Sequence, residues 1–250
     1  MGKETEYHIG IAKGEIPEYV LLPGDPKRAK AIAERFFDNP ELIADKREYL
    51  SYKGTYQGLP VAVCSTGIGC PSAAIAIEEL IHVGCHTFIR VGTAGAINNS
   101  LTAGDLVIIT GSVRDDGTSK QYVPVEFPAI ANPLVVSKLE QAAKKYTDRY
   151  FLGIGHSKDA FYSEYPDKVA DPDTTEKKWE MMRNSGVLAT EMEAATLFVI
   201  GHLRGVRVGS ICVIVGEPIE KEAKIIGKPD LGPLIHTALD SFVALQDSPD

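Results

Sequence analysis

PVAVCSTGIGCPSAAIAIEELIHVGCHTFIRVGT, residues 60–93, is the stretch that decides the fold class. Its two ends, Pro60–Ser65 and Thr87–Thr93, are short runs rich in β-branched residues and apolar on both faces, which predicts buried strands. The segment Ser72–Val83 between them follows Pro71, a favoured first residue of a helix, and its polar side chains gather on one side. A strand, a helix and a second strand in this order are typical of an α/β protein.

The same alternation extends along the chain. Further apolar runs predict strands at Tyr19–Pro23, Leu106–Val113, Phe151–Ser157 and Arg207–Val215. Helical patterns occupy Ala29–Phe36, Pro133–Tyr146, Ala194–Arg204 and Leu231–Leu245. Gln57-Gly58 between the runs Tyr49–Tyr56 and Leu59–Ser65 predicts a hairpin. The prolines and charges of Tyr162–Lys178 predict a long surface loop or lid. We therefore expect residues 1–250 to form a single α/β domain whose central mixed sheet or partial barrel is flanked by helices.

Composition limits the classes of function. The 250 residues are 44% hydrophobic and 24% charged, which is typical of a soluble globular protein. With 34 acidic against 26 basic residues the formal net charge is −8, so we expect neither nucleic acid nor an anionic membrane as a partner. The four cysteines form no C-x-x-C pair and have apolar neighbours, which indicates buried free thiols in a reducing compartment. Without a signal-like or membrane-spanning apolar run, the expected location is the cytoplasm.

Three segments carry residues suited to chemistry. The first is Leu21–Arg28, where an apolar strand ends in a glycine turn and Arg28 begins a helix. Amides at a helix start favour negative charge, so Gly24 and Arg28 could cradle an anion. An ordinary strand-to-helix turn with an exposed arginine explains the same residues equally well.

The second segment is TFIRVGTAGA, residues 87–96, in which Arg90 sits inside an apolar strand. A buried guanidinium without an anion costs several kcal/mol. The anion could be a structural carboxylate such as Asp105 or Glu79. It could also be a bound oxyanion, because the glycine turn and the Thr93 hydroxyl follow directly. The chain contains neither G-x-x-x-x-G-K-[ST] nor G-x-G-x-x-G, so it has no support for a nucleoside triphosphate loop or a dinucleotide fold.

The third segment, TEMEAATL at residues 190–197, places Glu191 and Glu193 on either side of Met192 where a strand becomes a helix. A carboxylate can accept hydrogen bonds from two neighbouring hydroxyls, and methionine gives an apolar contact for a sugar face. The alternative is that both acids complement the dipole at the start of a helix. None of the six histidines is spaced as a metal-ligand pair with these acids.

Together these segments resemble the nucleoside phosphorylase family of the purine nucleoside phosphorylase and uridine phosphorylase type. The resemblance extends over nearly the whole chain and includes further motifs in the same order. They are YHIG at 7–10, PGDPKR at 23–28, KREY at 46–49, STGIGCPS at 65–72, FIRVGTAGA at 88–96, EFPA at 126–129, DAFY at 159–162 and ATEMEAATL at 189–197.

The resemblance implies a role for each matching residue. Phosphate would be bound by Gly24, Arg28, Arg90 and Thr93, with Arg47 reaching in from a neighbouring subunit. Ribose would be bound by Glu191, Met192 and Glu193, and by His8 of the neighbour. The base would lie against Ala94, Gly95, Phe161, Tyr165 and Val215. In the uridine branch, Glu48, Ile68 and Ser72 match positions around a monovalent cation such as K⁺ at the dimer interface. A site completed by two chains implies a homodimer as the unit, and family members usually form hexamers, each a trimer of dimers.

The implied reaction transfers the sugar of a nucleoside to inorganic phosphate, the co-substrate, without a cofactor. Phosphate is already an anion and needs positioning and charge neutralisation rather than a general base. Arg90 would provide this. Glu193, by holding the ribose hydroxyls, would stabilise the positive charge that develops at C1′ as the base departs.

The base pocket departs from both branches of the family. Where uridine phosphorylases carry a Gln and an Arg, this chain has Tyr165 and Asp167, and the Asp of the purine branch is replaced by Val215 or Gly216. Glu217 could substitute for that acid. The apolar Ile214-Val215 and the helix pattern EKKWEMM at 176–182 are similar to the uridine branch, which favours uridine over a purine nucleoside or methylthioadenosine. A nucleosidase that uses water would lack the phosphate arginines, whereas a non-catalytic nucleoside-binding protein would tolerate the altered base pocket.

Overall fold

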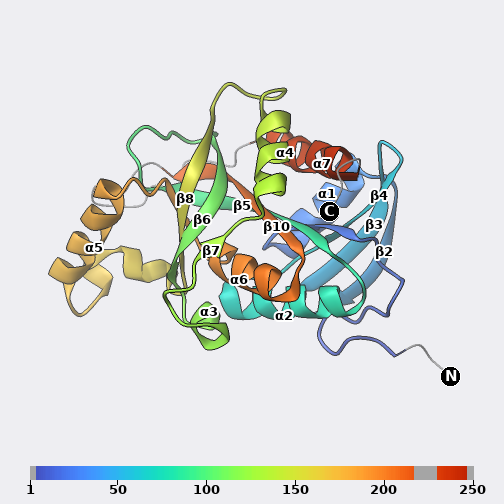
Figure 1. Cartoon of the computed structure of the whole chain (residues 1–250), viewed down its shortest axis with the longest axis horizontal. Helices are drawn as coiled ribbons and strands as arrows, with labels where there is room; N and C mark the ends of the chain where they lie inside the picture. The colour runs from blue at the N-terminus through green and yellow to red at the C-terminus, as the bar shows by residue number, and fades with distance from the viewer. Residues whose placement is uncertain (1–3, 217–229, 247–250) are drawn as a thin grey trace.

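The computed structural model describes residues 4–216 and 230–246, and it confirms an α/β fold (Figure 1). The strands are β1 Tyr19–Leu22, β2 Asp38–Lys46, β3 Tyr49–Tyr56, β4 Leu59–Cys64, β5 Thr87–Ala96, β6 Leu106–Asp115, β7 Ala129–Ile130, β8 Tyr150–Lys158, β9 Ala189–Glu191 and β10 Arg207–Gly216. The helices are α1 Pro26–Phe36, α2 Cys70–His82, α3 Thr118–Tyr122, α4 Pro133–Ala143, α5 Pro172–Asn184, α6 Ala194–Arg204 and α7 Gly232–Gln246, with 3₁₀ turns at Phe161–Glu164 and Pro166–Lys168.

The strands form a mixed sheet that closes on itself at one end. The strand order is β10-β6-β8-β9-β5-β1-β4-β3-β2, and β10 also pairs with β5. The five strands β10, β6, β8, β9 and β5 therefore make a closed barrel, from which β1, β4, β3 and β2 extend as an open sheet. Because β4, β1, β5 and β10 are mutually parallel, their carboxyl ends lie at one edge. In open α/β sheets this edge is where ligands bind.

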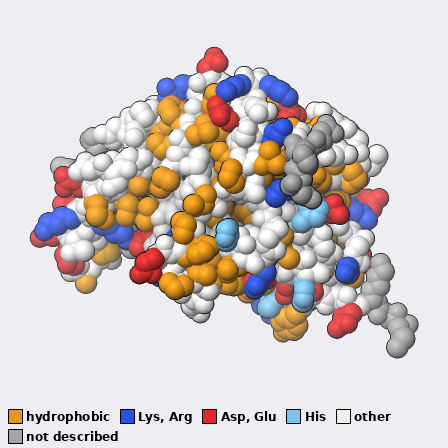
Figure 2. Space-filling view, in the orientation of Figure 1, with side chains coloured by type: hydrophobic (Ala, Val, Ile, Leu, Met, Phe, Trp, Pro, Cys, Tyr) orange, Lys and Arg blue, Asp and Glu red, His pale blue; other side chains and the backbone are white. Residues whose placement is uncertain are grey.

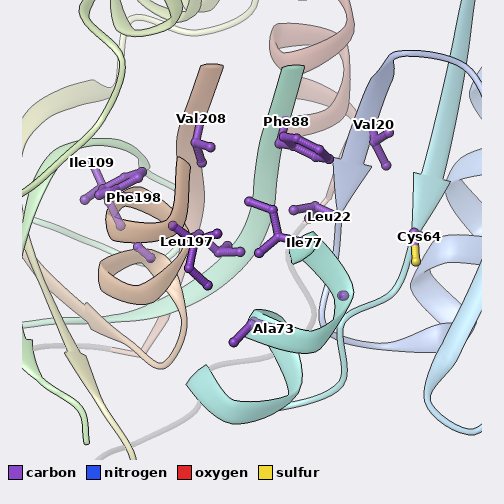
Figure 3. Close-up of a cluster of buried hydrophobic side chains, with 14 of the residues drawn as sticks. Val20, Leu22, Cys64, Ala73, Ile77, Phe88, Ile109, Leu197, Phe198 and Val208 are labelled. Carbon is purple, nitrogen blue, oxygen red and sulfur yellow. The ribbon is translucent and has the colours of Figure 1, made fainter. Parts of the chain in front are cut away.

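Helices cover the sheet on both faces. On one face α2 and α6 pack against strand residues such as Leu22 and Phe88; Figure 3 shows Ile77 of α2 and Leu197 of α6 within this layer. On the other face α1, α4 and α7 pack on the alternate strand residues, among them Leu21. Strands covered on both sides carry apolar residues in both directions, which is the pattern that the sequence predicted.

The structure differs from the predicted elements in the segment after β8 and at β2. The region predicted as a loop or lid over Tyr162–Lys178 is irregular only as far as Asp171, because the Asp171 side chain accepts a hydrogen bond from the Thr174 amide and Pro172 begins α5. Strand β2 was not predicted, since its side chains are charged or largely exposed and show no apolar run. The predicted hairpin is confirmed, with left-handed φ values of 51° at Gln57 and 82° at Gly58.

The surface and the cysteines agree with the composition. On the face in Figure 2, lysines and arginines lie interspersed with acidic side chains rather than in a basic patch. All four cysteines, Cys64, Cys70, Cys85 and Cys212, are buried free thiols. Within residues 4–216 and 230–246, no helix is long and apolar enough to cross a membrane.

Candidate active site

A cavity of about 840 Å³ opens at the carboxyl ends of the parallel strands. Gly24 follows β1, Gly67 follows β4, Thr93 lies in the carboxyl-terminal half of β5, and Val215 lies near the end of β10. The fold thus brings together segments that are far apart in the sequence. Many of the site residues predicted from the sequence line this cavity. They are Gly24, Arg28, Glu48, Ile68, Ser72, Arg90, Thr93, Ala94, Gly95, Phe161, Glu191, Met192, Glu193 and Val215.

Arg90 projects from β5 onto the two predicted ribose-binding carboxylates. Its Nε donates to Glu191 Oε2 over 2.8 Å, and its Nη2 is ion-paired with Glu193. Burial by itself would lower the pKa of Arg90, but the charges of Glu193 and Glu191 outweigh burial and raise it. A β-carbon at Gly92 would lie 2.9 Å from Arg90 Nη2, so a glycine is needed for the guanidinium to lie across the strand. The suggestion that Asp105 or Glu79 partners Arg90 is wrong: Asp105 binds Arg149 and Glu79 binds His8.

The two carboxylates are themselves held by backbone amides. Glu191 accepts hydrogen bonds from the amides of Glu193 and Ala194, both at 2.9 Å, at the start of α6. Glu191 therefore both binds the amides at the start of α6 and lines the cavity, so the two interpretations of this residue are compatible. Glu193 Oε1 accepts the Gly69 amide over 2.6 Å. Burial raises the pKa of Glu193 although Arg90 opposes the shift. Three backbone amides, those of Gly69, Glu193 and Ala194, thus orient the two carboxylates without a bound substrate.

Arg28 differs from Arg90 in having no carboxylate partner among the residues that the structure describes. It lines the cavity from the first turn of α1, and none of the ion pairs between described residues includes it. Burial and the positive charge of Arg90 lower the pKa of Arg28. Two guanidiniums facing a shared space, one of them without a counter-ion in the part of the chain that the structure describes, form a site for an anion.

The cavity lining also contains residues that the sequence did not single out. Lys158 at the end of β8 forms an ion pair with Glu164 and donates to Thr190 Oγ1 over 2.8 Å. Both ionised groups are only 4% exposed and both line the cavity. Phe161 and Tyr162 form the rim. Nothing in the sequence distinguished this lysine and glutamate from surface charges; their burial arises only when the 3₁₀ turn folds over β8.

Some predicted site residues lie elsewhere. Tyr165 is partly buried and lies outside the cavity lining, where Tyr162 and Glu164 stand instead. Arg47 is exposed in the turn between β2 and β3, with a φ of 57°, and does not line its own chain's cavity. His8 is held by Glu79, with Nδ1 2.6 Å from Oε1, beside a second, smaller pocket. Glu217 lies outside the described residues.

The predicted cation ligands lie together at the cavity edge. Ser72 Oγ donates to Glu48 Oε1 over 3.0 Å, and the Ile68 side chain beside them is 78% exposed. The described residues contain no group of three His, Cys, Asp or Glu side chains suited to a metal ion.

These features define an α/β protein with a deep small-molecule site in which cationic and anionic side chains face each other. The chain belongs to the phosphorylase superfamily, whose family model matches residues 18–227. It is 43% identical to uridine phosphorylase of Treponema pallidum (strain Nichols), over 98% of this chain and 97% of the relative. It is 40% identical to guanosine phosphorylase of Halorubrum lacusprofundi, over 87% of this chain and 86% of the relative. The crystal structure of uridine phosphorylase from Vibrio fischeri ES114 matches with a TM-score of 0.85 and 31% identity, over 96% of this chain and 98% of that chain.

Proposed function

We propose that this protein is a nucleoside phosphorylase that cleaves uridine with inorganic phosphate to give uracil and ribose 1-phosphate. The observation that carries the proposal is Arg28, a half-buried guanidinium without a carboxylate partner among the described residues, next to Arg90 in a cavity that also holds Glu191 and Glu193. The arginines suit phosphate, and the carboxylates suit the hydroxyls of a ribose. Relatives named uridine phosphorylase support the choice of nucleoside.

In this mechanism phosphate enters between Arg28, Arg90, the Thr93 hydroxyl and the turn at Gly24. The arginines neutralise its charge and hold one oxygen toward C1′ of the ribose. Glu193 accepts hydrogen bonds from the ribose hydroxyls, and Met192 packs on the sugar face. As the glycosidic bond breaks, the carboxylate and the phosphate stabilise the positive charge on the sugar. Because Arg90 contacts both Glu191 and Glu193, it fixes the spacing between the phosphate and ribose subsites.

The experiment is base release from purified protein with and without phosphate. We expect uracil release from uridine only when phosphate is present, with ribose 1-phosphate as the second product. Equal release in phosphate-free buffer would show a nucleosidase instead. Release from no nucleoside at all would show a binding protein.

Guanosine is a second candidate substrate. It is favoured by the 40% identity to a guanosine phosphorylase and by Glu164, a buried carboxylate in the cavity. A carboxylate can accept both the N1–H and the 2-amino group of guanine. The same assay with guanosine, and with methylthioadenosine for comparison, ranks these substrates against uridine.

We also propose that two chains complete each site, in a homodimer that assembles further into a hexamer. His8 and Arg47 lie on the surface, away from their own chain's cavity, which supports a role in a neighbour's site. The test mixes Arg28→Ala chains with Arg47→Ala chains. In a mixed dimer one site has both arginines intact, so mixing two variants that are impaired at low phosphate restores activity at low phosphate. If mixing restores nothing, Arg47 does not act across chains.

At the proposed dimer interface a K⁺ ion would be bound by oxygen atoms of Glu48 and Ser72 and by the exposed loop at Ile68. The hydrogen bond of 3.0 Å from Ser72 Oγ to Glu48 Oε1 supports this placement, because it brings two oxygen atoms that could bind the cation close together. The ion would hold the two chains together and would take no part in the chemistry. We place the enzyme in the cytoplasm, where its buried thiols stay reduced.

A further inference from the structure

The buried Lys158–Glu164 ion pair in the cavity wall has hydrogen-bonding capacity that no described residue uses. The Lys158 ammonium carries three N–H donors, of which one goes to Thr190 and one to Glu164. The Glu164 carboxylate uses Oε1 for the lysine, and its Oε2 makes no hydrogen bond with the described residues. Both groups line the cavity and are nearly excluded from water. A donor and an acceptor therefore stand side by side at the cavity wall, where leaving either one unpaired is costly.

The position of this pair places it at the base rather than at the sugar. Lys158 is anchored on Thr190, and Thr190 is the register partner of Gly95 at the end of β5. The Lys158 ammonium also lies 5.8 Å from the centre of the Phe161 ring. Gly95 lies five residues beyond Arg90 along β5, and both Gly95 and Phe161 line the cavity. A nucleoside whose ribose lies against Glu193 would therefore direct its base toward Lys158 and Glu164.

A chain of hydrogen bonds fixes the orientation of the donor. His156, fully buried, has Nε2 3.0 Å from Asp115 Oδ2 and Nδ1 3.0 Å from Thr190 Oγ1. A carboxylate can only accept, so Nε2 carries a proton. In the neutral ring Nδ1 then accepts the Thr190 hydroxyl proton, and the Thr190 oxygen is left to accept from Lys158. The remaining Lys158 donor and the free Glu164 oxygen are thereby held in one arrangement.

We propose that Lys158 and Glu164 read the base as a matched donor and acceptor, and that they select a carbonyl next to a ring N–H. Lys158 donates to the carbonyl oxygen and Glu164 accepts the N–H. Uracil, thymine, hypoxanthine and guanine present this edge. Cytosine and adenine present an amino group next to an unprotonated ring nitrogen, so they bring donor against donor and acceptor against acceptor.

The pair also acts on the departing base. When the bond from C1′ to the base breaks, the bonding electrons remain on the base, and the negative charge is shared with its carbonyl oxygens. The Lys158 ammonium stabilises that charge in a water-poor site. Glu164 holds the Lys158 ammonium in place through their ion pair. This inference rests on the proposed phosphorolysis and assigns its base specificity to two residues of this chain.

The test compares matched nucleosides, uridine with cytidine and inosine with adenosine, at saturating phosphate. Wild-type protein should favour the first of each pair in kcat/KM by at least about 100-fold, because a site built for a polar edge rejects the mismatched one strongly. In Lys158→Met/Glu164→Gln, which leaves no unpaired buried charge, the ratio should fall at least about 10-fold while the KM for phosphate stays within about 2-fold. Lys168→Met, which removes an exposed ion-paired lysine of the neighbouring turn outside the lining, should keep the wild-type ratio.

Two outcomes would overturn the inference: a wild-type ratio near one, or an unchanged ratio in an active double variant. A purely structural role would lower turnover of both members of a pair equally. Binding of free uracil and cytosine, measured by calorimetry on wild-type protein and on the double variant, tests the same edge without catalysis. If uracil binds selectively but no base is released from any nucleoside, the phosphorylase proposal fails while the assignment of the pair stands.

Discussion

The two ends of the cavity are made from different kinds of structure. At the proposed phosphate and ribose end, Arg90 and Glu191 project from strands and Arg28 from the first turn of a helix. At the base end, the strand residue Lys158 meets Glu164 from a 3₁₀ turn, and Tyr162 on the rim is 71% exposed. The first end is built mainly on strand and helix residues, whereas the second depends on a short irregular segment. We infer that the first end sets the reaction and the second sets the choice of base.

The largest effect should come from breaking the phosphate end at its centre. Arg90→Ala should lower phosphate-dependent kcat/KM by about 10³-fold or more, because it removes the anion contact and the spacer between subsites. It also leaves two buried carboxylates without their cation, which should cost about 3–5 kcal/mol of unfolding free energy. Both are measured by initial rates and by urea unfolding.

The control for Arg90→Ala is Arg204→Ala, which removes a surface ion pair with Glu78. It should change stability by less than about 1 kcal/mol and leave turnover unchanged. Phosphate-dependent turnover that survives Arg90→Ala would assign this arginine to the fold alone.

Arg28→Ala should separate binding from stability at the same end. We expect the KM for phosphate to rise about 10- to 100-fold, because the variant loses one or two charged hydrogen bonds to phosphate. The melting temperature should stay the same or rise, because a lowered arginine pKa means that the folded state disfavours the charged form. A fall in melting temperature like that of Arg90→Ala would contradict the unpaired state of Arg28.

Asp115→Asn tests the support behind the base end. Burial alone would raise the pKa of Asp115, but hydrogen bonds with His156 and Lys178 hold it at about 2, below its ordinary 3.8. A carboxyl group whose pKa is lower in the folded than in the unfolded protein stabilises the fold at pH values above its unfolded-state pKa. This contribution is lost as the pH falls through the pKa of the folded state. Between about pH 5 and pH 2 the wild type should therefore lose about 1 kcal/mol more than the variant, a figure reduced for partial exposure. Parallel unfolding curves for the two proteins would contradict this.

The smallest effect should be at the rim. Tyr162→Ala should raise the KM for the nucleoside about 3- to 5-fold, since a mostly exposed ring contributes about 1 kcal/mol to stacking. Tyr165→Ala, outside the lining, should leave this KM within about 2-fold. A larger effect at Tyr165 than at Tyr162 would favour the base-binding role that the sequence assigned to Tyr165. Initial rates at saturating phosphate distinguish the two.

The same contrast explains what the sequence could predict. That Arg28, Arg90, Glu191 and Glu193 lie in one cavity was predictable, because these residues stand in short motifs next to strands. Arg90 before its glycine turn is an example. Lys158 and Glu164 were not predictable, because a lysine and a glutamate six residues apart carry no period and resemble solvated charges. Strand β2 was missed for a related reason: its exposed side chains have no apolar face, and only pairing with β3 makes it a strand. Sequence patterns report burial along one element, whereas these features come from contacts between elements.

The buried thiols give this protein its own reporters of local opening. Burial raises the pKa of Cys212 to about 12, and a β-carbon at Gly92, beside the Arg90 guanidinium, would lie 3.0 Å from its sulfur. Only the thiolate reacts readily with alkylating reagents, so Cys212 should be modified only when this region opens. Phosphate that binds the closed state should slow that modification in proportion to its occupancy. The affinity of the site for phosphate can therefore be measured from the rate of labelling of a native cysteine, with no nucleoside present and no turnover.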